Sequence, residues 1–228
     1  MEIYAVTIPD KIEQQQFDEL LKYISVEKQK RVKQHKRPQN ALQIITADIL
    51  IRSIVHKKFK IKNSNIDFKT NEYGKPYLPG FSEFHFNISH SRKWVVCAVD
   101  NMPIGIDVEF IRPINFDIAR KFFSHTEYND LFSKSDSERL EYFYELWTLK
   151  ESYIKAAGKG MAIPLNSFSI QIINGKITIE SQTQFTDYYF RKYDIDVNYK
   201  LAVCAKNNLF PDNIIHKSFD QLFEEINK

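Results

Sequence analysis

The chain has 228 residues, which suits one large domain or two small ones around a sizeable core. Hydrophobic residues make up 43% and charged residues 27%, and only six glycines and eight prolines occur, which excludes long disordered tracts. The net charge of +3 is too small to indicate a partner by itself. The two cysteines, Cys97 and Cys204, exclude a disulfide framework, and no Cys/His spacing is typical of zinc.

The N-terminal sequence and the hydropathy give no sign of export or membrane insertion. The first 16 residues lack the basic region and apolar stretch of a signal peptide. No apolar run is long enough to cross a bilayer. We therefore expect a cytoplasmic protein without a membrane partner.

The first half alternates between helical and strand-like patterns. Gly74, Pro76, Pro79 and Gly80 mark a loop within it. The spacing of apolar residues predicts a strand at 2–8, helices at 12–24, after Ser25 and at 39–58, and strands at 84–88 and 94–100.

The second half has a similar plan of helices followed by strands. Residues 104–110 read as a strand, and the turn Asn101-Met102-Pro103 predicts a hairpin with the strand before it. Helices are expected near 115–123, 136–157 and the C-terminus, and strands at 167–173, 176–181, 187–194 and 199–205. We expect an α+β protein of two similar halves, 1–103 and 104–228, that share one interface.

Two carboxylates are placed close together in the strand Gly105-Ile106-Asp107-Val108-Glu109. Side chains alternate along a strand, so Asp107 and Glu109 point to one face while Ile106 and Val108 point into a core. Paired carboxylates repel unless a cation lies between them, and hard oxygen ligands suit Mg²⁺, or Mn²⁺ in its place. A solvated strand end is the more common explanation for such a pair considered alone.

A second carboxylate pattern lies in the helical segment 147–155, WTLKESYIK. Glu151 and Lys155 are four residues apart and share one helix face. They form either a surface ion pair or a site in which a carboxylate completes a metal shell and an ammonium holds a phosphate.

Polar residues at two loop positions could contact an anion. Ser89 and His90 follow a predicted strand, where exposed polar groups can hydrogen-bond a phosphate. In Tyr73-Gly74-Lys75-Pro76 the glycine permits close backbone approach and Lys75 offers a cation. A structural histidine and an ordinary surface turn are the alternatives.

The stretch from Lys28 to Arg37 is basic and contains no acid. Lys28 and Arg31 are three residues apart on one helix face, so they could bind an anion. A solvated helix is the simpler explanation. No stacking aromatics interleave the stretch, so we do not expect nucleic acid as the partner.

Taken in order, the motifs YGKP at 73–76, FNISHS at 86–91, GIDVE at 105–109 and WTLKES at 147–152 resemble the Sfp-type 4′-phosphopantetheinyl transferases. The stretches 122–131 and 156–170 extend the resemblance over nearly the whole chain. It implies a pseudo-two-fold pair of α+β halves with the active site between them. The implied reaction transfers 4′-phosphopantetheine from coenzyme A to a serine of an apo carrier protein and releases 3′,5′-ADP.

The resemblance also implies roles for individual residues. Asp107, Glu109 and Glu151 would hold Mg²⁺, with Glu151 also a candidate base and Lys155 a second catalytic residue. Coenzyme A would be bound by Lys28, Arg31, Tyr73, Gly74, Lys75, Pro76, Ser89 and His90.

The chain departs from the family where the 3′-phosphate is held. Gln43 and Ile44 stand where family members often carry a basic residue and a threonine. Neither supplies charge, so Lys36 or Arg37 is expected to substitute.

The implied protein partner is an apo carrier protein that is acidic around its serine. It is expected to dock near 111–124, where Arg112, Arg120 and Lys121 supply steering charges. We expect a monomer, because both halves of the site lie on one chain. The alternatives are a metal-dependent nuclease or phosphodiesterase, and a non-enzymatic module that binds nucleic acid through residues 28–37.

Overall fold

The computed structural model describes residues 1–35, 37–181 and 187–226. Lys36, one of the substitutes expected at the 3′-phosphate, falls outside these ranges. None of the described helices combines the length and the apolar composition that a bilayer-spanning segment requires.

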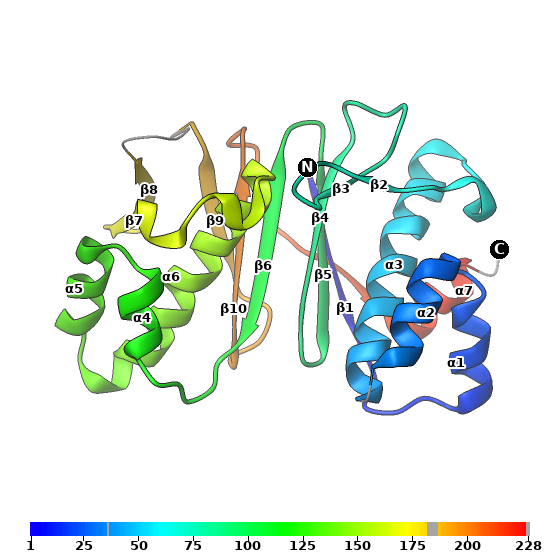
Figure 1. The fold of residues 1–228 in the computed structure, drawn as a ribbon, viewed down its shortest axis with the longest axis horizontal. Coiled ribbons are helices and arrows are strands. Elements are labelled where there is room, and N and C mark those ends of the chain that lie inside the picture. Colours follow the sequence, from blue (N-terminus) through cyan, green and yellow to red (C-terminus); the bar gives the residue numbers. More distant parts are fainter. Residues whose placement is uncertain (36, 182–186, 227–228) are drawn as a thin grey trace.

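The first half consists of a sheet and the helices on its outer face, at the right of Figure 1. Ser25 caps α2 by accepting a hydrogen bond from the Lys28 amide, and Pro38 opens α3, where its missing N–H is not needed. Its elements are β1 (Glu2–Thr7), α1 (Gln14–Leu21), α2 (Val26–Gln34), α3 (Pro38–Phe59), η1 (Asn63–Asn65), β2 (Lys69–Thr70), β3 (Pro76–Tyr77), β4 (His85–Ser91) and β5 (Trp94–Asp100).

The second half, at the left of Figure 1, contains the other long helix. A capping box between Ser124 and Glu127 starts α5, and Gly158 in the left-handed conformation ends α6. The elements from residue 104 onward are β6 (Ile104–Phe110), α4 (Asp117–Phe122), α5 (His125–Ser133), α6 (Asp136–Ala157), η2 (Gly160–Ala162), η3 (Leu165–Ser167), β7 (Phe168–Ile173), β8 (Lys176–Ser181), β9 (Tyr189–Tyr193), β10 (Tyr199–Ala205), β11 (Ile215–Ser218) and α7 (Phe219–Ile226).

Two sheets pack face to face between the two long helices. The first has the strand order β11-β1-β5-β4 and the second has β6-β10-β9. One face of the first sheet packs on α3, and the other meets Ile106 and Val108 of the second sheet in a shared core. The far face of the second sheet packs on α6. The predicted α+β class and the inward direction of Ile106 and Val108 are confirmed.

Two predictions about chain path are wrong. Residues 94–100 and 104–110 do not form a hairpin, because β5 pairs on its two edges with β1 and β4, and β6 pairs with β10. The predicted second half, 104–228, also includes a C-terminal segment that belongs to the first half. Strand β11 pairs in parallel with β1, and α7 packs against α3, so the C-terminal segment completes the first half.

The two sheets meet at β4 and β6 through side chains. Asn87, Ser89 and Ser91 alternate along one side of β4 and accept hydrogen bonds from backbone amides of β6. The donors are the amides of Ile106 at 2.9 Å, Val108 at 3.4 Å and Phe110 at 3.0 Å. The three amides therefore have partners, although none of the described strands forms backbone hydrogen bonds with this edge of β6.

Helix α6 lies directly on β6 at Gly105. A Cβ atom at this position would lie 2.0 Å from the carbonyl oxygen of Ser152 and 2.4 Å from the amide nitrogen of Ala156. Only glycine permits this approach, which brings Glu151 and Lys155 of α6 beside the carboxylates of β6.

The Gly105→Ala substitution should lower the free energy of unfolding by about 3 kcal/mol, because α6 would have to move off the strand. Thermal or urea unfolding measures the loss. Gly80→Ala is the control, since Gly80 has open space around it and a φ of 82°. That control should cost about 1 kcal/mol from backbone strain alone. Equal losses in the two variants would show that close packing at Gly105 is not required.

Candidate active site

Asp107 lies at the centre of a polar cluster between the two halves. Its Oδ1 accepts hydrogen bonds from the Ser89 hydroxyl at 2.9 Å and from the Lys155 ammonium at 2.5 Å. The ammonium also donates to the Ser89 hydroxyl at 3.0 Å and to the carbonyl of Ile106 at 3.3 Å. Three elements that are distant in sequence, β4, β6 and α6, therefore converge on one carboxylate.

Glu109 is two residues further along the same face of β6. The Ser91 hydroxyl donates a hydrogen bond to its Oε2 at 3.0 Å. Burial raises the pKa of Glu109 to about 7, and the charge of the adjacent Asp107 acts in the same direction. The carboxyl is therefore poised to exchange protons, or to gain a cation, near neutral pH.

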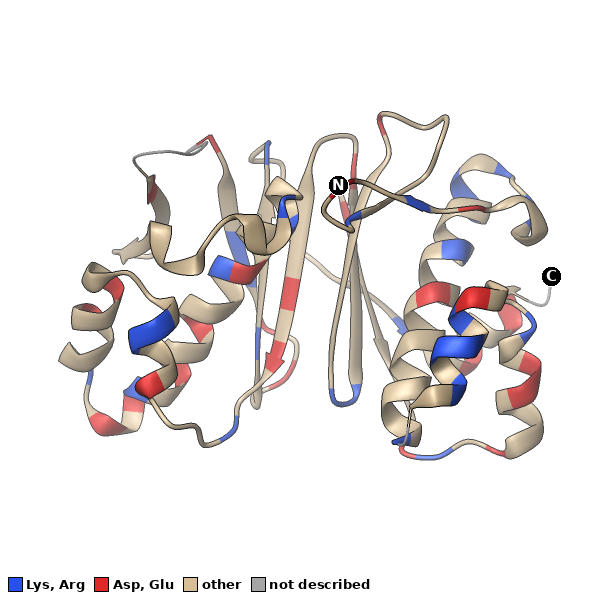
Figure 2. Cartoon of the chain, viewed as in Figure 1, with Lys and Arg blue, Asp and Glu red and all other residues tan. Residues whose placement is uncertain are grey.

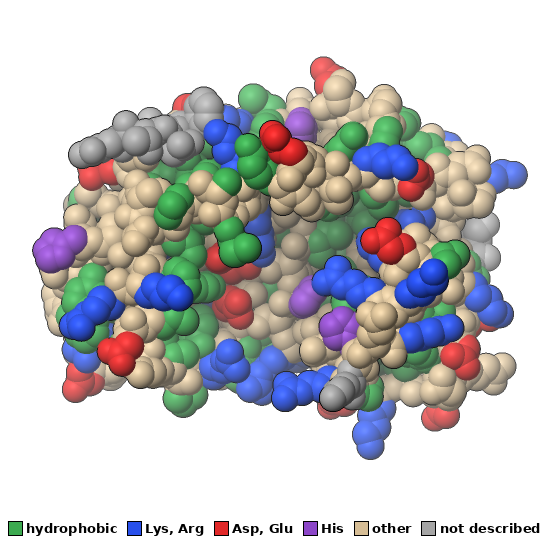
Figure 3. Space-filling view, viewed as in Figure 1, with side chains coloured by type: hydrophobic (Ala, Val, Ile, Leu, Met, Phe, Trp, Pro, Cys, Tyr) green, Lys and Arg blue, Asp and Glu red, His purple; other side chains and the backbone are tan. Residues whose placement is uncertain are grey.

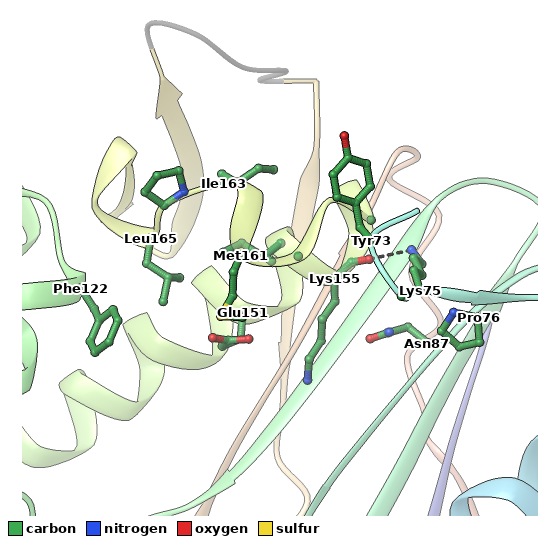
Figure 4. A pocket seen from close by; sticks show the side chains of 15 residues that line it. Tyr73, Lys75, Pro76, Asn87, Phe122, Glu151, Lys155, Met161, Ile163 and Leu165 are labelled. Atoms are coloured by element: carbon green, nitrogen blue, oxygen red, sulfur yellow. Dashed lines mark hydrogen bonds between the residues drawn. The ribbon is translucent and has the colours of Figure 1, made fainter. Parts of the chain in front are cut away.

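Glu151 faces the same space from α6, one turn before Lys155. Figure 4 shows both side chains extending from the helix toward the cavity. Burial raises the pKa of Glu151, and the Asp107 charge raises it further, while Lys155 opposes the shift. Figure 2 likewise places acidic positions of β6 and α6 next to each other between the halves.

The donor chemistry of this cluster fits a divalent cation. Oδ2 of Asp107 is buried and accepts no hydrogen bond from the described residues. A cation there would satisfy this oxygen and offset the burial and the repulsion by Asp107 that raise the pKa values of Glu109 and Glu151. Within the described ranges, no three Asp, Glu, His or Cys side chains form a ready-made metal cage. Mg²⁺ commonly takes one or two carboxylates and completes its shell with substrate phosphates.

A cavity of about 440 Å³ adjoins the carboxylates. Its lining combines the Tyr73–Pro76 loop of the first half with α6 and the segment after it in the second (Figure 4). The space-filling view in Figure 3 shows acidic side chains on the floor of a hollow between the halves and basic ones around it. A substrate bound here would contact both halves at once.

The loop at 73–76 is tied to the C-terminal end of α6. The Asn71 side chain accepts hydrogen bonds from the amides of Tyr73 at 3.0 Å and Lys75 at 2.8 Å, and it donates to the carbonyl of Gly158 at 2.9 Å. Gly74 has a φ of 86°, which explains the glycine at the turn. Tyr73 and Pro76 both line the cavity.

Lys75 has other partners than the phosphate expected from sequence. Its ammonium donates to the carbonyls of Ile104 at 3.0 Å, Lys155 at 2.6 Å and Ala156 at 3.2 Å. Two of these carbonyls are at the end of α6, where a cation is favourable. Desolvation lowers the pKa of Lys75 to about 8. The structure thus gives Lys75 a fixed place between the halves.

His90 is the next residue along β4 after Ser89, and its ring is accessible to solvent. Partial desolvation lowers its pKa, and the nearby Lys155 charge adds to this effect. Arg31 of α2 contributes in the same direction. A neutral imidazole in this position can donate one hydrogen bond to a phosphate oxygen.

The basic helix α2 is anchored by a buried carboxylate that the sequence analysis did not weigh. Lys28 forms an ion pair with Asp48 of α3, whose side chain is fully buried. Arg52 binds the other Asp48 oxygen at 2.8 Å, so one carboxylate orients two cations. Arg31 is exposed on the same helix.

The residues at the expected 3′-phosphate position are not available to a ligand. Gln43 is buried and donates its amide hydrogen to the carbonyl of Arg92 at 2.8 Å. Ile44 packs against the first core. Arg37 precedes the first turn of α3 and is exposed, so it is the described basic residue that fits the expected substitution.

Sequence reasoning missed three residues that organise the site: Asn71, Asn87 and Ser91. Their partners lie far along the chain, so no local spacing could reveal them. The alternation of polar side chains in Asn87-Ile88-Ser89-His90-Ser91 was the available signal. It predicts one polar side of a strand, which the structure uses to hold β6.

A buried ion pair supports α6 at Lys150, next to Glu151. The Lys150 ammonium contacts both carboxylate oxygens of Glu127 at 2.6 Å and the carbonyl of Phe168 at 2.8 Å. The same carboxylate accepts hydrogen bonds from the amides of Ser124 and Ile170. These contacts join α5, α6 and β7, so Glu127 of the stretch 122–131 and Lys150 of the motif WTLKES have structural roles.

Comparison with known proteins identifies the class. Residues 103–204 match the family model of the 4′-phosphopantetheinyl transferase superfamily, and residues 11–102 match a 4′-phosphopantetheinyl transferase N-terminal model. The 4′-phosphopantetheinyl transferase Sfp of Bacillus subtilis is 40% identical over 97% of this chain and all of its own length. The transferase gsp of Aneurinibacillus migulanus is 40% identical over 90% of this chain and 86% of its own.

More distant relatives extend the comparison. The human L-aminoadipate-semialdehyde dehydrogenase-phosphopantetheinyl transferase is 27% identical over 85% of this chain and 70% of its own. The crystal structure of Thermotoga maritima holo-[acyl-carrier-protein] synthase covers 46% of this chain and 62% of its own, with a TM-score of 0.41 and 18% identity, which is too slight a likeness for an argument. On the extended matches, the chain belongs to the 4′-phosphopantetheinyl transferase superfamily. The prediction of an Sfp-type transferase is confirmed.

In EDTA, ionisation of Glu109 should lower the stability of the protein as the pH rises from about 4.5 to about 7. The folded state holds the Glu109 proton more tightly than the unfolded chain, because its pKa is raised from 4.5 to about 7. Deprotonation therefore costs folding free energy across that window. Glu109→Gln removes this term and should be more stable than the parent by about 1 kcal/mol at pH 8, with no difference below pH 4.5.

Urea unfolding at several pH values measures this difference. Asp67→Asn, at an exposed position, serves as the control. A stability difference between Glu109→Gln and the parent that does not change with pH would contradict the assignment.

Proposed function

We propose that the chain transfers 4′-phosphopantetheine from coenzyme A to a serine of apo carrier proteins, giving a holo carrier and 3′,5′-ADP. The observation that carries this proposal is the convergence of Asp107, Glu109, Glu151 and Lys155 on one hollow between two halves. The extended identity to the Sfp transferase of Bacillus subtilis supports it.

A bound Mg²⁺, or Mn²⁺, would be held by Asp107, Glu109 and Glu151 and would offset charge on the pyrophosphate of coenzyme A. Asp107 offers a buried free oxygen, and the other two carboxylates face the same space. Ser89 fixes the opposite oxygen of Asp107, so the carboxylate has one available orientation.

The chain's own residues would align the reaction. The serine oxygen of the carrier attacks the phosphorus that bears the pantetheine arm, and the bond to the 3′,5′-ADP oxygen breaks. Glu151, whose pKa is raised by burial, would accept the serine proton. The positive charge of the Lys155 ammonium, which lines the cavity, would stabilise the charge that develops on the phosphate oxygens.

The remaining contacts would position coenzyme A. Tyr73, Gly74 and Pro76 line the cavity and would receive the adenine, with Lys75 holding their loop against α6. His90 would donate to the pyrophosphate. Lys28 and Arg31 of α2, with Arg37, would face the 3′-phosphate. This set differs from the sequence prediction in giving Lys75 a positioning role.

The alternatives explain less. A nucleic-acid module gives no role to Asp107, Glu109 and Glu151, whose carboxylates lie near one another at the boundary of the halves. A nuclease does not require the Tyr73–Pro76 loop to be tied to the end of α6.

An apolar surface beside the cavity is the proposed docking site for the carrier protein. Phe122 of α4 lines the cavity and packs edge-on against Trp147. Ile118 and Phe132 extend the apolar surface and are 37% and 39% exposed. Within the described ranges, Arg120 and Lys121 of α4 have no ion-pair partner, so they can attract an acidic surface.

We also propose that the protein acts as a cytoplasmic monomer. Both cysteines are free and buried, as in a reducing compartment. The hollow is built entirely from one chain.

Incubation of a purified apo peptidyl or acyl carrier protein with this protein, coenzyme A and Mg²⁺ should add the mass of one phosphopantetheine to the carrier. Intact-mass analysis measures the product. Asp107→Ala or EDTA should lower the rate by about 100-fold or more, since charge on the pyrophosphate is no longer offset. Asp67→Ala, an exposed acid elsewhere, should leave the rate unchanged. Several carrier types without any mass gain would overturn the proposal.

Reversal of two charges on α4, Arg120→Glu with Lys121→Glu, should raise the KM for the carrier about tenfold at low salt and change kcat little. The effect should shrink at high salt, because the charges are exposed. Lys62→Glu, at the residue that precedes η1 in the first half, is the control. A KM that is the same for parent and double variant at both salt concentrations would place the docking surface elsewhere.

A further inference from the structure

Ser91 uses both hydrogen-bonding functions of its hydroxyl at the boundary between the halves. The oxygen accepts a hydrogen bond from the Phe110 amide at 3.0 Å. The hydroxyl proton is donated to Oε2 of Glu109, also at 3.0 Å. One side chain of the first half therefore fixes both the backbone and the carboxylate of the second half.

The contact differs from the equivalent one at Asp107. The Ser89 hydroxyl holds Asp107 together with the Lys155 ammonium, so Asp107 has two partners on one oxygen. The only side-chain hydrogen bond that the described residues give to the Glu109 carboxylate comes from Ser91. Loss of the hydroxyl would leave this carboxylate free to rotate.

We propose that Ser91 is a positioning residue that orients Glu109 toward the divalent cation. The inference rests on the proposed function, because that function gives Glu109 its role as a ligand. Carboxylate ligands are commonly held by hydrogen bonds from a second layer of residues, and these contacts strongly affect metal affinity. With Oε2 held by Ser91, the other oxygen of Glu109 has a defined direction.

A purely structural role would have a different signature. Asn87 joins the same two strands by accepting from the Ile106 amide at 2.9 Å, but it has no hydrogen bond to a carboxylate among the described residues. Breaking the strand contact at Asn87 should therefore reduce stability and should weaken cation affinity less than the same break at Ser91. Breaking it at Ser91 should reduce both.

The test is titration of the purified full chain with Mn²⁺ alone, with free Mn²⁺ measured by electron paramagnetic resonance. Ser91→Ala should raise the Mn²⁺ dissociation constant by about tenfold or more. Ser91→Thr retains the hydroxyl and should stay within about threefold of the parent. Ser91→Cys keeps the side-chain volume with a weaker donor, so it reports the same loss if the alanine variant does not fold.

Two controls separate positioning from general damage. Ser169→Ala removes a half-buried strand hydroxyl that bonds Ser124 away from the carboxylates. Asn87→Ala removes a strand contact of the kind made by Ser91. Ser169→Ala should bind Mn²⁺ within about threefold of the parent, and Asn87→Ala should lose less affinity than Ser91→Ala, whatever their melting temperatures.

The outcomes are distinct from those of the transfer assay. Unchanged Mn²⁺ affinity in folded Ser91→Ala or Ser91→Cys, or equal losses in Ser91→Ala and Asn87→Ala, would overturn the inference even if the parent transfers phosphopantetheine. A parent that binds no Mn²⁺ would overturn it as well. If the parent binds Mn²⁺ and the Ser91 variants lose affinity, but no carrier is modified, the inference stands and the proposed function fails.

Discussion

The arrangement of the site depends on the hydrogen bonds that three side chains of β4 accept from backbone amides of β6. Asn87, Ser89 and Ser91 replace the carbonyls of a neighbouring strand, so two separate sheets meet in a fixed register. That register determines which residues of β6 lie beside the first half. Asp107 and Glu109 then contact the same serines through their carboxylates.

The boundary between the halves holds three carboxylates and one ammonium in a partly buried space. Desolvation and mutual repulsion raise the pKa values of Glu109 and Glu151, which is a cost to the folded protein. At Asp107, hydrogen bonds from Lys155 and Ser89 stabilise the carboxylate. The close contact of α6 with Gly105 is what allows Lys155 to reach β6, so one glycine and one polar strand together place the cluster.

The sequence was sufficient for local elements and for motifs that carry charge. The helix predicted at 136–157 and the strand at 104–110 match α6 and β6, because long periodic segments bury one face. Family resemblance gave the transferase class, which the comparisons confirm. Within the site, the acids at 107, 109 and 151 and Lys155 do lie together.

The pairing of strands that are distant along the chain could not be predicted from the sequence. The hairpin expected around Asn101-Met102-Pro103 fails because the neighbours of β5 come from residues 2–7 and 85–91. Strand β11 has four residues and little periodicity, so its return to the first sheet left no local signal. The sequence also cannot distinguish a lysine whose ammonium binds a phosphate from one, such as Lys75, whose ammonium donates to backbone carbonyls.

The central claim is that coenzyme A binds between the halves, against the loop at 71–76 and the segment at 158–165. Hydrogen–deuterium exchange of the full chain, with and without coenzyme A and Mg²⁺, tests it most directly. The account predicts slower amide exchange in both segments together, since the ligand would contact both. Protection confined to one half, or absent from both segments, would contradict it.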